Sequence, residues 1–323
     1  MQELLQTTFP MSVHRSGVVA LVGRPNVGKS TLLNRLVGEK VAIVSPKPQT
    51  TRVRILGVVH RPAGQAAFVD TPGIHEAKGA LHKAMVEAAL GSAEEADLVL
   101  LLVEPAPGRD GTPVLTPATR ELVQRLSSLR TSLLLVVNKV DAVAKPLLLP
   151  FVAELAALRP GAEVLLVSAR TGDGVEQLLE TVLSRLPEGP PLFDAGTFTD
   201  QQERGLAAEL IREQVLRHTR QEVPHAAAVA VEEFDESERE PRPGAAERGG
   251  LQGLVRIFAT IYLERESQKA IVIGKRGAML KTIGTDARKA LERLLDAHVY
   301  LDLRVKVEPR WSETEAGLRK VGL

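Results

Sequence analysis

Cysteine is absent from this chain of 323 residues. Its absence excludes disulfide bonds, a thiol nucleophile and cysteine-based zinc sites, and it is typical of proteins in the reducing cytoplasm. Aromatic residues make up only 3% of the chain, so stacking on aromatic rings can contribute little to any nucleic-acid site. Long hydrophobic runs are also missing, because "LVLLLV", at residues 98–103, is far too short to span a bilayer.

The chain also lacks an excess of charge of either sign, because 41 basic residues face 40 acidic ones and leave a net charge of +1. This balance excludes a uniformly basic coat for nucleic acid, so any RNA or DNA site must be local. The first residues, "MQELLQTTFPMSVHR", do not follow the basic-then-apolar order of a secretory signal. We therefore expect a soluble, cytoplasmic protein.

The length of the chain exceeds what one hydrophobic core usually serves, which predicts two domains. A cluster of turn and breaker residues, "PEGPPLFDAGTFTD" at residues 187–200, marks the boundary between them. The predicted division is an N-terminal extension at residues 1–14, a first domain at 15–187, a linker at 188–202, a second domain at 203–310 and a C-terminal tail at 311–323.

Short apolar runs alternate with amphipathic segments throughout the first domain. Buried strands are predicted at residues 18–22, 66–69, 98–103, 132–137 and 163–167, and helices at residues 29–37, 116–126, 147–158 and 175–186. This alternation predicts a three-layer α/β domain around a parallel sheet. Ligands of such folds bind beyond the carboxyl ends of the strands, so the residues after each strand are the candidates for function.

The strongest motif is "GRPNVGKS" at residues 23–30, which follows a predicted strand, opens a helix and matches the phosphate-binding loop at every fixed position. Gly23 and Gly28 allow the tight turn that points backbone N–H groups at phosphate oxygens. Lys29 supplies a positive charge for the β- and γ-phosphates, and the Ser30 hydroxyl is a ligand for Mg²⁺.

Two further motifs predict a pocket for the guanine base. In "NKVD", the carboxylate of Asp141 can accept hydrogen bonds from both N1–H and N2–H₂ of guanine, which adenine could not supply. Asn138 is predicted to contact the base and hold the neighbouring loops, and the stem of Lys139 to lie along the base. "SAR", beginning at Ser168, follows the next strand and completes the pocket with backbone N–H groups.

Two polar segments are predicted to close over the γ-phosphate. In "DTPGIH", Asp70 reaches Mg²⁺ through water and Gly73 brings its backbone N–H to the phosphate. In "PQTTR", a threonine closes over Mg²⁺ when GTP is bound, with Thr51 as the first choice and Thr50 as the second. Ile74 stands where many GTPases carry the glutamine that orients water, so charge stabilisation must come from another group.

In this order, "GRPNVGKSTLLN", "SPKPQTTR", "DTPGIH", "NKVD" and "SAR" resemble the Era family of P-loop GTPases, which carry a C-terminal type II KH domain. The resemblance runs from about Arg15 to Leu323, and the chain departs from it in a short N-terminal extension and a Pro/Gly-rich loop at residues 236–250. The implied catalytic residues are Lys29, Thr51, Gly73 and Asn26, and the implied metal ligands are Ser30, Thr51 and Asp70. The implied GTP-binding residues are Gly23, Arg24, Pro25, Asn26, Val27, Gly28, Lys29, Ser30, Thr31, Asp70, Thr71, Pro72, Gly73, Ile74, Asn138, Lys139, Val140, Asp141, Ser168 and Ala169.

The second domain has its own signal for RNA binding. Its pattern predicts the order α-β-β-α-α-β, and "GKRG" at residues 274–277 precedes a helix rich in basic residues. Gly-x-x-Gly loops with two basic residues clamp the backbone of single-stranded nucleic acid in KH domains, although such a loop can also serve only as a helix cap. Ile271, Ile273 and Ile283 are predicted as apolar walls for the bases. The implied RNA-binding residues are Ile273, Gly274, Lys275, Arg276, Gly277 and Lys281.

The resemblance implies a GTP-hydrolysing switch that binds the 3′ end of small-subunit rRNA and acts in assembly of the small ribosomal subunit. It also implies Mg²⁺, potassium held by Asn26, a monomer and peripheral contact with the inner membrane. Asn26 could instead only cap the phosphate loop. Two other classes remain: the GTPase module of a tRNA-modification system and a membrane-associated signalling GTPase, although no amphipathic basic helix is evident.

Overall fold

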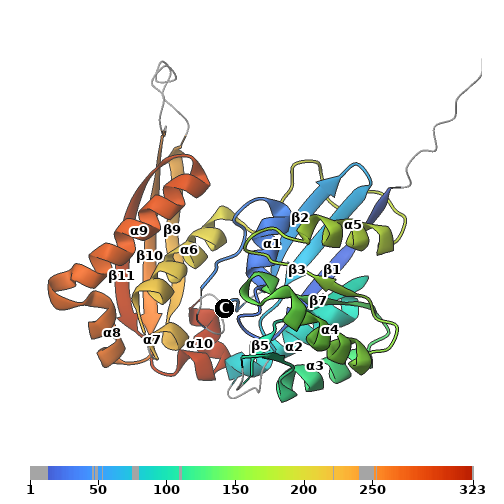
Figure 1. The fold of residues 1–323 in the computed structure, drawn as a ribbon. Helices are drawn as coiled ribbons and strands as arrows, with labels where there is room; N and C mark the ends of the chain where they lie inside the picture. The colour runs from blue at the N-terminus through green and yellow to red at the C-terminus, as the bar shows by residue number, and fades with distance from the viewer. Residues whose placement is uncertain are drawn as a thin grey trace, which may run out of the picture.

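The computed structural model describes residues 14–45, 47, 50–52, 54–74, 80–108, 111–220, 222–239, 251 and 253–321. Two α/β units lie side by side, the first from blue to green and the second from yellow to red (Figure 1). The predicted N-terminal extension lies outside the described residues, except for residue 14. Among the described residues, no helix is long and apolar enough to cross a membrane.

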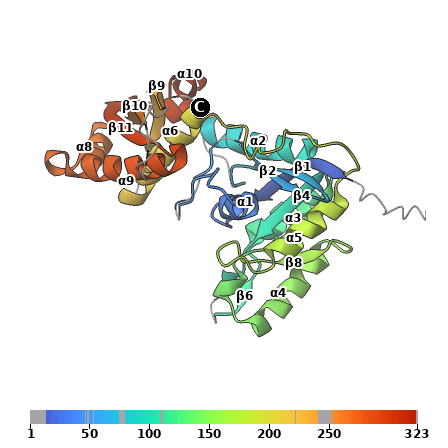
Figure 2. The ribbon, with the colours of Figure 1, turned by 90° about the horizontal axis from the view of Figure 1, so that it is seen from above.

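The first unit is a sheet of six strands covered by helices on both faces (Figures 1 and 2). In spatial order its strands are β2 (Ile55–Arg61), β3 (Gly64–Asp70), β1 (Arg15–Gly23), β4 (Leu98–Val103), β7 (Ser132–Val137) and β8 (Val164–Leu166). Its helices are α1 (Lys29–Val37), α2 (Ala80–Glu95), α3 (Pro117–Ser127), α4 (Lys145–Leu158) and α5 (Val175–Arg185). A two-stranded ribbon, β5 (Ala106–Pro107) with β6 (Pro113–Val114), follows β4.

The five predicted strands are confirmed and all run parallel, whereas β2 pairs with β3 in the antiparallel direction at the edge. Side chains of β1 alternate between two cores, as the pleat of a strand requires. Val19 and Leu21 pack with α1 and α5, while Ala20 and Val22 pack with α2, α3 and α4. Burial on both faces explains why these strands read as unbroken apolar runs.

The linker covers the antiparallel edge strand. Residues 187–202 form neither a helix nor a named strand. Val58 of β2 donates its N–H to the carbonyl of Phe198 at 3.0 Å, and the hydroxyl of Thr199 donates to the carbonyl of Leu56 at 2.8 Å. These bonds satisfy β2 groups that an uncovered edge would leave unpaired.

The second unit is a three-stranded sheet with helices, in the predicted order except for one additional short helix before the first strand. It contains α6 (Glu203–His218), a short α7 (Val223–Ala226), β9 (Ala228–Glu238), β10 (Leu254–Leu263), α8 (Glu266–Ile273), α9 (Ala278–Leu295) and β11 (His298–Val307). The central β10 is antiparallel to β9 and parallel to β11. The predicted tail forms a turn of 3₁₀-helix, η3 (Trp311–Glu313), and α10 (Glu315–Lys320).

Candidate functional site: a phosphate loop, a base pocket and a basic groove

The phosphate loop connects β1 to α1 and is shaped by close backbone contacts. Gly28 has φ 97°, and a Cβ atom there would lie 2.3 Å from the amide nitrogen of Asn138, so only glycine fits. Lys29 is buried, and its ammonium group donates to the carbonyls of Gly23 and Arg24, each at 3.2 Å. Burial lowers the pKa of Lys29, and the charge of Asp70 opposes that effect.

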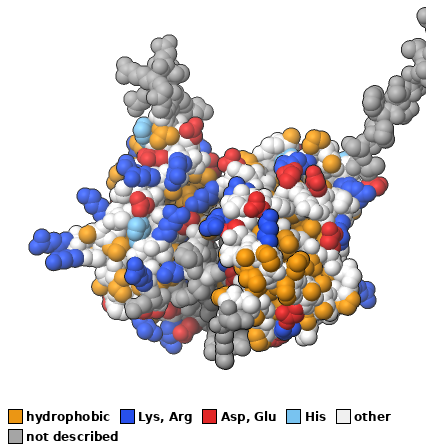
Figure 3. All heavy atoms as spheres, viewed as in Figure 1, with side chains coloured by type: hydrophobic (Ala, Val, Ile, Leu, Met, Phe, Trp, Pro, Cys, Tyr) orange, Lys and Arg blue, Asp and Glu red, His pale blue; other side chains and the backbone are white. Residues whose placement is uncertain are grey.

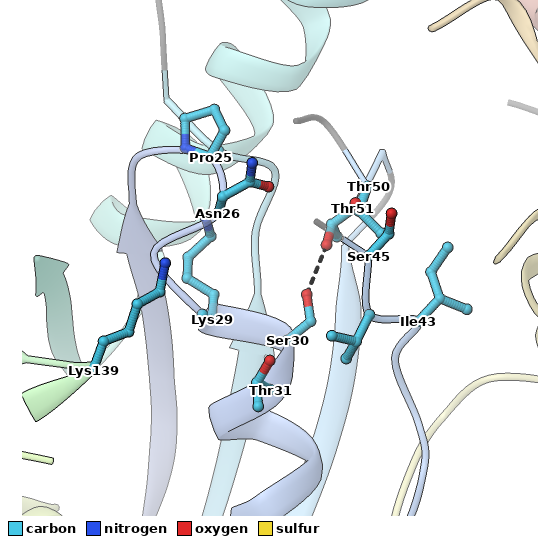
Figure 4. A pocket seen from close by; sticks show the side chains of 13 residues that line it. Pro25, Asn26, Lys29, Ser30, Thr31, Ile43, Ser45, Thr50, Thr51 and Lys139 are labelled. Carbon is cyan, nitrogen blue, oxygen red and sulfur yellow. Dashed lines mark hydrogen bonds between the residues drawn. The ribbon is translucent and has the colours of Figure 1, made fainter. Parts of the chain in front are cut away.

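The three predicted metal ligands converge beside this loop. The hydroxyls of Ser30 and Thr51 lie 2.9 Å apart (Figure 4) and donate to the same carboxylate oxygen of Asp70, at 2.5 and 3.1 Å. The other oxygen, Oδ1, is buried without a hydrogen-bond partner among the described residues. Burial raises the pKa of this carboxyl group, against the charge of Lys29 and the two hydroxyl bonds. Hydroxyl and carboxylate oxygens are ligands that suit Mg²⁺, so the residues present fit that ion.

The segment after Asp70 packs tightly on the phosphate loop. A Cβ atom at Gly73 would lie 2.6 Å from the backbone nitrogen of Pro25, which explains glycine at this point. The N–H of Ile74 donates to the carbonyl of Gly23 at 3.1 Å, and its side chain lies in the core between the sheet and α2. Ile74 therefore supports the loop and does not face the pocket.

The base pocket is assembled by Asn138, as predicted for a residue that holds neighbouring loops. Its amide donates to the carbonyl of Val27 at 2.7 Å, and its amide oxygen accepts the N–H of Ala169 at 2.9 Å. One side chain thus joins the phosphate loop to the "SAR" loop. Lys139, with φ 64°, forms an ion pair with Glu104 and lines the pocket.

The carboxylate of Asp141 is occupied by two side chains of the "SAR" loop. One oxygen accepts the hydroxyl of Ser168 at 2.6 Å, and the other is paired with the guanidinium of Arg170, whose side chain is 77% exposed. The hydrogen bond from Ser168, and then the charge of Arg170, hold the pKa of Asp141 below its usual range. The group is therefore a carboxylate at neutral pH, with both of its oxygens engaged by the "SAR" loop.

The predicted residues divide into those that line the pocket and those that support it. The lining contains Pro25, Asn26, Gly28, Lys29, Ser30, Thr31, Thr51, Gly73 and Lys139. It also contains residues outside the predicted GTP-binding set: Ile43, Val44, Ser45 and Thr50, the last of them the second choice for closing over Mg²⁺. Thr71 is fully buried and donates its hydroxyl to Leu21, so it faces the sheet. The described residues contain no cluster of three or more His, Asp or Glu side chains arranged to hold a metal ion.

The "GKRG" loop joins α8 to α9 and presents its backbone and cations outward. Gly274 and Gly277 have φ values of 70° and 79°, and a Cβ atom at Gly277 would meet no protein atom within 4 Å. Lys275 and Arg276 are exposed at the N-terminus of α9, an 18-residue helix. A backbone open to close approach, two cations and a helix N-terminus together suit a phosphate group.

A groove continues from this loop between α9 and the edge strand β11. Leu301 and Leu303 of β11 form one wall. On the opposite wall, Gly284 of α9 has no side chain that would extend into the groove. Its lining is Gly277, Leu280, Lys281, Gly284, Thr285, Arg288, Leu301 and Leu303. The β11 residues and Arg288 were not among the predicted RNA-binding residues, because nothing in the local sequence indicates that β11 lies beside α9.

Basic side chains gather over this unit in Figure 3, including its outer end beside the α8–α9 junction. Lys275, Arg276, Lys281 and Arg288 are all exposed. The prediction that Ile283 is a wall for bases is wrong, because this side chain is fully buried in the core under α9. Ile271, in contrast, is 43% exposed.

The fold and both sites define a class: a P-loop GTPase joined to a KH domain. A family model described as a 50S ribosome-binding GTPase matches residues 18–139, and one described as a KH domain matches residues 222–312. Curated relatives are similar over nearly the whole chain. GTPase Era of Geotalea uraniireducens (strain Rf4) is 49% identical, with 95% of this chain and 97% of the relative covered, and GTPase Era of Geobacter metallireducens is 48% identical at the same coverage.

Two solved structures of Era are also similar to this chain over nearly its whole length. Aquifex aeolicus Era Y63A bound to GDP·AlF4⁻ is 40% identical, with a TM-score of 0.85 and 95% of this chain and 99% of that one covered. Era in complex with MgGDPNP and nucleotides 1506–1542 of 16S ribosomal RNA is 41% identical, with a TM-score of 0.85 and coverage of 96% and 99%. The chain belongs to the Era family of GTPases.

Proposed function

We propose that this GTPase holds Mg²⁺ with the oxygens of Ser30, Thr51 and Asp70, and cradles the phosphates of GTP with residues 23–31. When bound there, the ion would supply positive charge that stabilises the phosphates of GTP during hydrolysis. Lys29 adds a positive charge from a buried position, where electrostatic stabilisation is stronger than in water. The convergence of the three oxygen-bearing side chains, with one buried oxygen of Asp70 left unpaired among the described residues, supports this assignment.

Specificity for guanine is assigned to Asp141. Its ionised carboxylate can pair with N1–H and N2–H₂ of guanine once the guanidinium of Arg170 moves away. The hydroxyl of Ser168 and the bonds of Asn138 orient the surrounding loops. An adenine base would leave the carboxylate without donors, which costs affinity.

Potassium is assigned to Asn26, since Ile74 cannot orient water. Asn26 is an exposed residue that lines the phosphate pocket, at a φ of 64°. Its side-chain oxygen would hold the cation against the phosphates, where an arginine finger acts in other GTPases. Wild type should then hydrolyse GTP faster in KCl than in NaCl at equal ionic strength.

Single-turnover hydrolysis in both salts tests this assignment. Asn26→Ala should lose the preference for potassium, and Asn26→Gly, which tolerates the same backbone conformation, separates that loss from strain. Ile74→Ala, changed at a side chain outside the pocket, should stay within several-fold of wild type. A wild type indifferent to potassium, or a preference that persists in both Asn26 variants, would reject the assignment.

The KH domain is proposed to bind the 3′ end of 16S rRNA, and the protein to act in assembly of the small ribosomal subunit. The solved relative in complex with nucleotides 1506–1542 of 16S rRNA supports this substrate. In this chain, the groove beside α9 combines leucines for bases with four exposed cations for phosphates. Cytoplasmic location, peripheral membrane contact and a monomeric state stay predictions.

Sequencing of RNA crosslinked to the protein in cells tests the proposed partner. Enrichment at the 3′ end of 16S rRNA is expected, because the solved relative is in complex with that part of the RNA. Enrichment of tRNA would instead support the tRNA-modification class, and no RNA enrichment would favour the signalling class.

A further inference from the structure

The segment that carries Thr51 lies against the KH domain rather than alone on the surface of the GTPase domain. Ile43 is 2% exposed and belongs to the apolar core of the second unit. The next residue, Val44, donates its N–H to Glu213 of α6 at 3.1 Å. Glu213 is fully buried and also pairs with Lys40 at 2.6 Å. The connection between α1 and β2 is thus anchored in the other domain.

Arg212 of α6 holds the residue just before Thr51. Its side chain is 2% exposed, and one guanidinium nitrogen donates to the backbone carbonyl of Thr50. The same guanidinium is oriented by Glu209, with contacts of 2.6 and 2.8 Å. A buried guanidinium fixed by a carboxylate is a rigid donor, since little rotamer freedom remains to be lost.

Arg52 holds the residue just after Thr51. It is buried, and its guanidinium donates to the carbonyls of Ala227 at 2.7 Å and Pro224 at 3.3 Å. It also lies over the ring of Trp311, 5.3 Å from the centroid, and Trp311 is itself fully buried. Burial, and then the nearby charge of Arg212, lower the pKa of Arg52 to about 9. Carbonyl oxygens and an aromatic face offset the cost of burying this cation.

Thr51 therefore lies between two residues that are both tied to the KH domain, while its own hydroxyl lies 2.9 Å from Ser30 and 3.1 Å from Asp70. Helix α2, which follows the "DTPG" segment, contacts the same region, because Leu81 and Met85 pack in one cluster with Trp311. The GTPase domain by itself supplies no comparable anchor for the carbonyl of Thr50 among the described residues.

We propose that Arg212 and Arg52 are positioning residues for Thr51, so that the KH domain completes the metal site of the GTPase domain. The inference rests on the proposed role of Thr51 as a metal ligand. A ligand displaced by about 1 Å can cost about a hundredfold in rate, which makes rigid support at both neighbours effective. The support already holds Thr51 beside Ser30 and Asp70, so its loss should be felt most where GTP and Mg²⁺ need that hydroxyl and least in binding of GDP.

The experiment compares full-length Arg212→Ala, Arg52→Lys and Thr51→Ala with wild type. It measures single-turnover GTP hydrolysis against Mg²⁺ concentration, together with affinity for GDP. Each variant should need several-fold more Mg²⁺ for half-maximal hydrolysis and turn over about tenfold more slowly, with GDP affinity within about twofold of wild type. Arg185→Ala, on α5 and paired only with Glu163 among the described residues, is the control expected to match wild type.

Double variants separate positioning from a general structural effect. If Arg212 acts through Thr51, adding Arg212→Ala to Thr51→Ala should change hydrolysis no further, whereas independent effects would multiply. Multiplied effects, or normal Mg²⁺ dependence in Arg212→Ala and Arg52→Lys, would overturn the positioning inference alone. Normal Mg²⁺ dependence in Thr51→Ala would instead overturn the proposed metal site. Should Arg212→Ala fail to fold, Arg212→Lys keeps a cation but loses the two-point contact with Glu209 that orients the guanidinium toward Thr50, and the same outcomes apply.

Discussion

The nucleotide site and the RNA groove use polar residues in opposite ways. Asp70 is fully buried and receives two hydroxyls, so its geometry depends on a few short contacts. Lys275 and Arg276 are exposed on an open loop, where they contribute charge more than a fixed geometry. In the proposed roles, the first site would read a defined ligand through preorganised bonds, while the second would attract a flexible polyanion through summed charge. Single substitutions should therefore have abrupt effects in the first site and graded effects in the second.

The largest effect is expected at Asp70. Asp70→Asn keeps the shape of the side chain but removes the negative charge that faces Lys29 and would face Mg²⁺. Single-turnover GTP hydrolysis at saturating Mg²⁺ should fall by about a hundredfold or more. Asp194→Asn, the same change at an exposed linker residue, is the control and should leave the rate unchanged. A rate within about threefold of wild type in Asp70→Asn would break the contrast between the two sites.

A large effect on specificity is expected at Asp141. Asp141→Asn replaces an acceptor with an amide that can donate to the carbonyl that xanthine carries in place of the amino group of guanine. Relative affinity for xanthosine triphosphate over GTP should rise by about a hundredfold, measured by competition against a fluorescent nucleotide. If the variant still prefers GTP, Asp141 does not read the base.

A graded effect is expected in the RNA groove. Lys275→Glu with Arg276→Glu should weaken binding of single-stranded 16S rRNA 3′-end RNA by about ten- to a hundredfold at low salt. The slope of log affinity against log salt should become shallower by about 1.4, because two phosphate contacts are lost. Filter binding over a range of KCl concentrations measures both quantities, and GTP affinity should stay unchanged.

The matched control for this pair carries the same change in net charge on the other domain. Arg125→Glu with Arg130→Glu alters two exposed residues at and after the end of α3. Equal losses of RNA affinity in the two double variants would indicate that total charge, not the "GKRG" loop, governs binding. An unchanged salt slope in Lys275→Glu with Arg276→Glu would remove the loop from the RNA site.

The smallest effect is expected at Arg170, whose exposed guanidinium is paired with the half-buried carboxylate of Asp141. Arg170→Ala frees one oxygen of Asp141 for guanine, so fluorescent GDP should associate about two- to threefold faster in stopped-flow measurements. The effect is small because the side chain of Arg170 is 77% exposed and its ion pair is weakened by water. Slower association in this variant would assign Arg170 to nucleotide binding rather than to competition with it.

Local patterns were sufficient for the motifs and for most elements of both units, although α2, α7 and the β5–β6 ribbon were not predicted. The unbroken apolar run at residues 98–103 can be stable only when both faces are covered, and it forms the central strand β4. The phosphate loop could be predicted because its glycines, lysine and serine act within eight consecutive residues. Local sequence could not predict the antiparallel direction of β2 or the burial of Ile283, because both depend on packing partners that are distant in sequence.

The sequence by itself determined which chemistry this protein offers: a phosphate loop, an acid in the "NKVD" motif that is proposed to read guanine, and a basic Gly-x-x-Gly loop. The reason is that each depends on residue types at short spacing, where backbone geometry leaves few alternatives. Only the tertiary structure decided how the two domains meet. In the sequence, Arg52 and Arg212 look like ordinary charged residues, yet both are buried in the structure. Folding brings Thr50 to Arg212, and Ala227 and Trp311 to Arg52, from segments more than 150 residues apart in the chain.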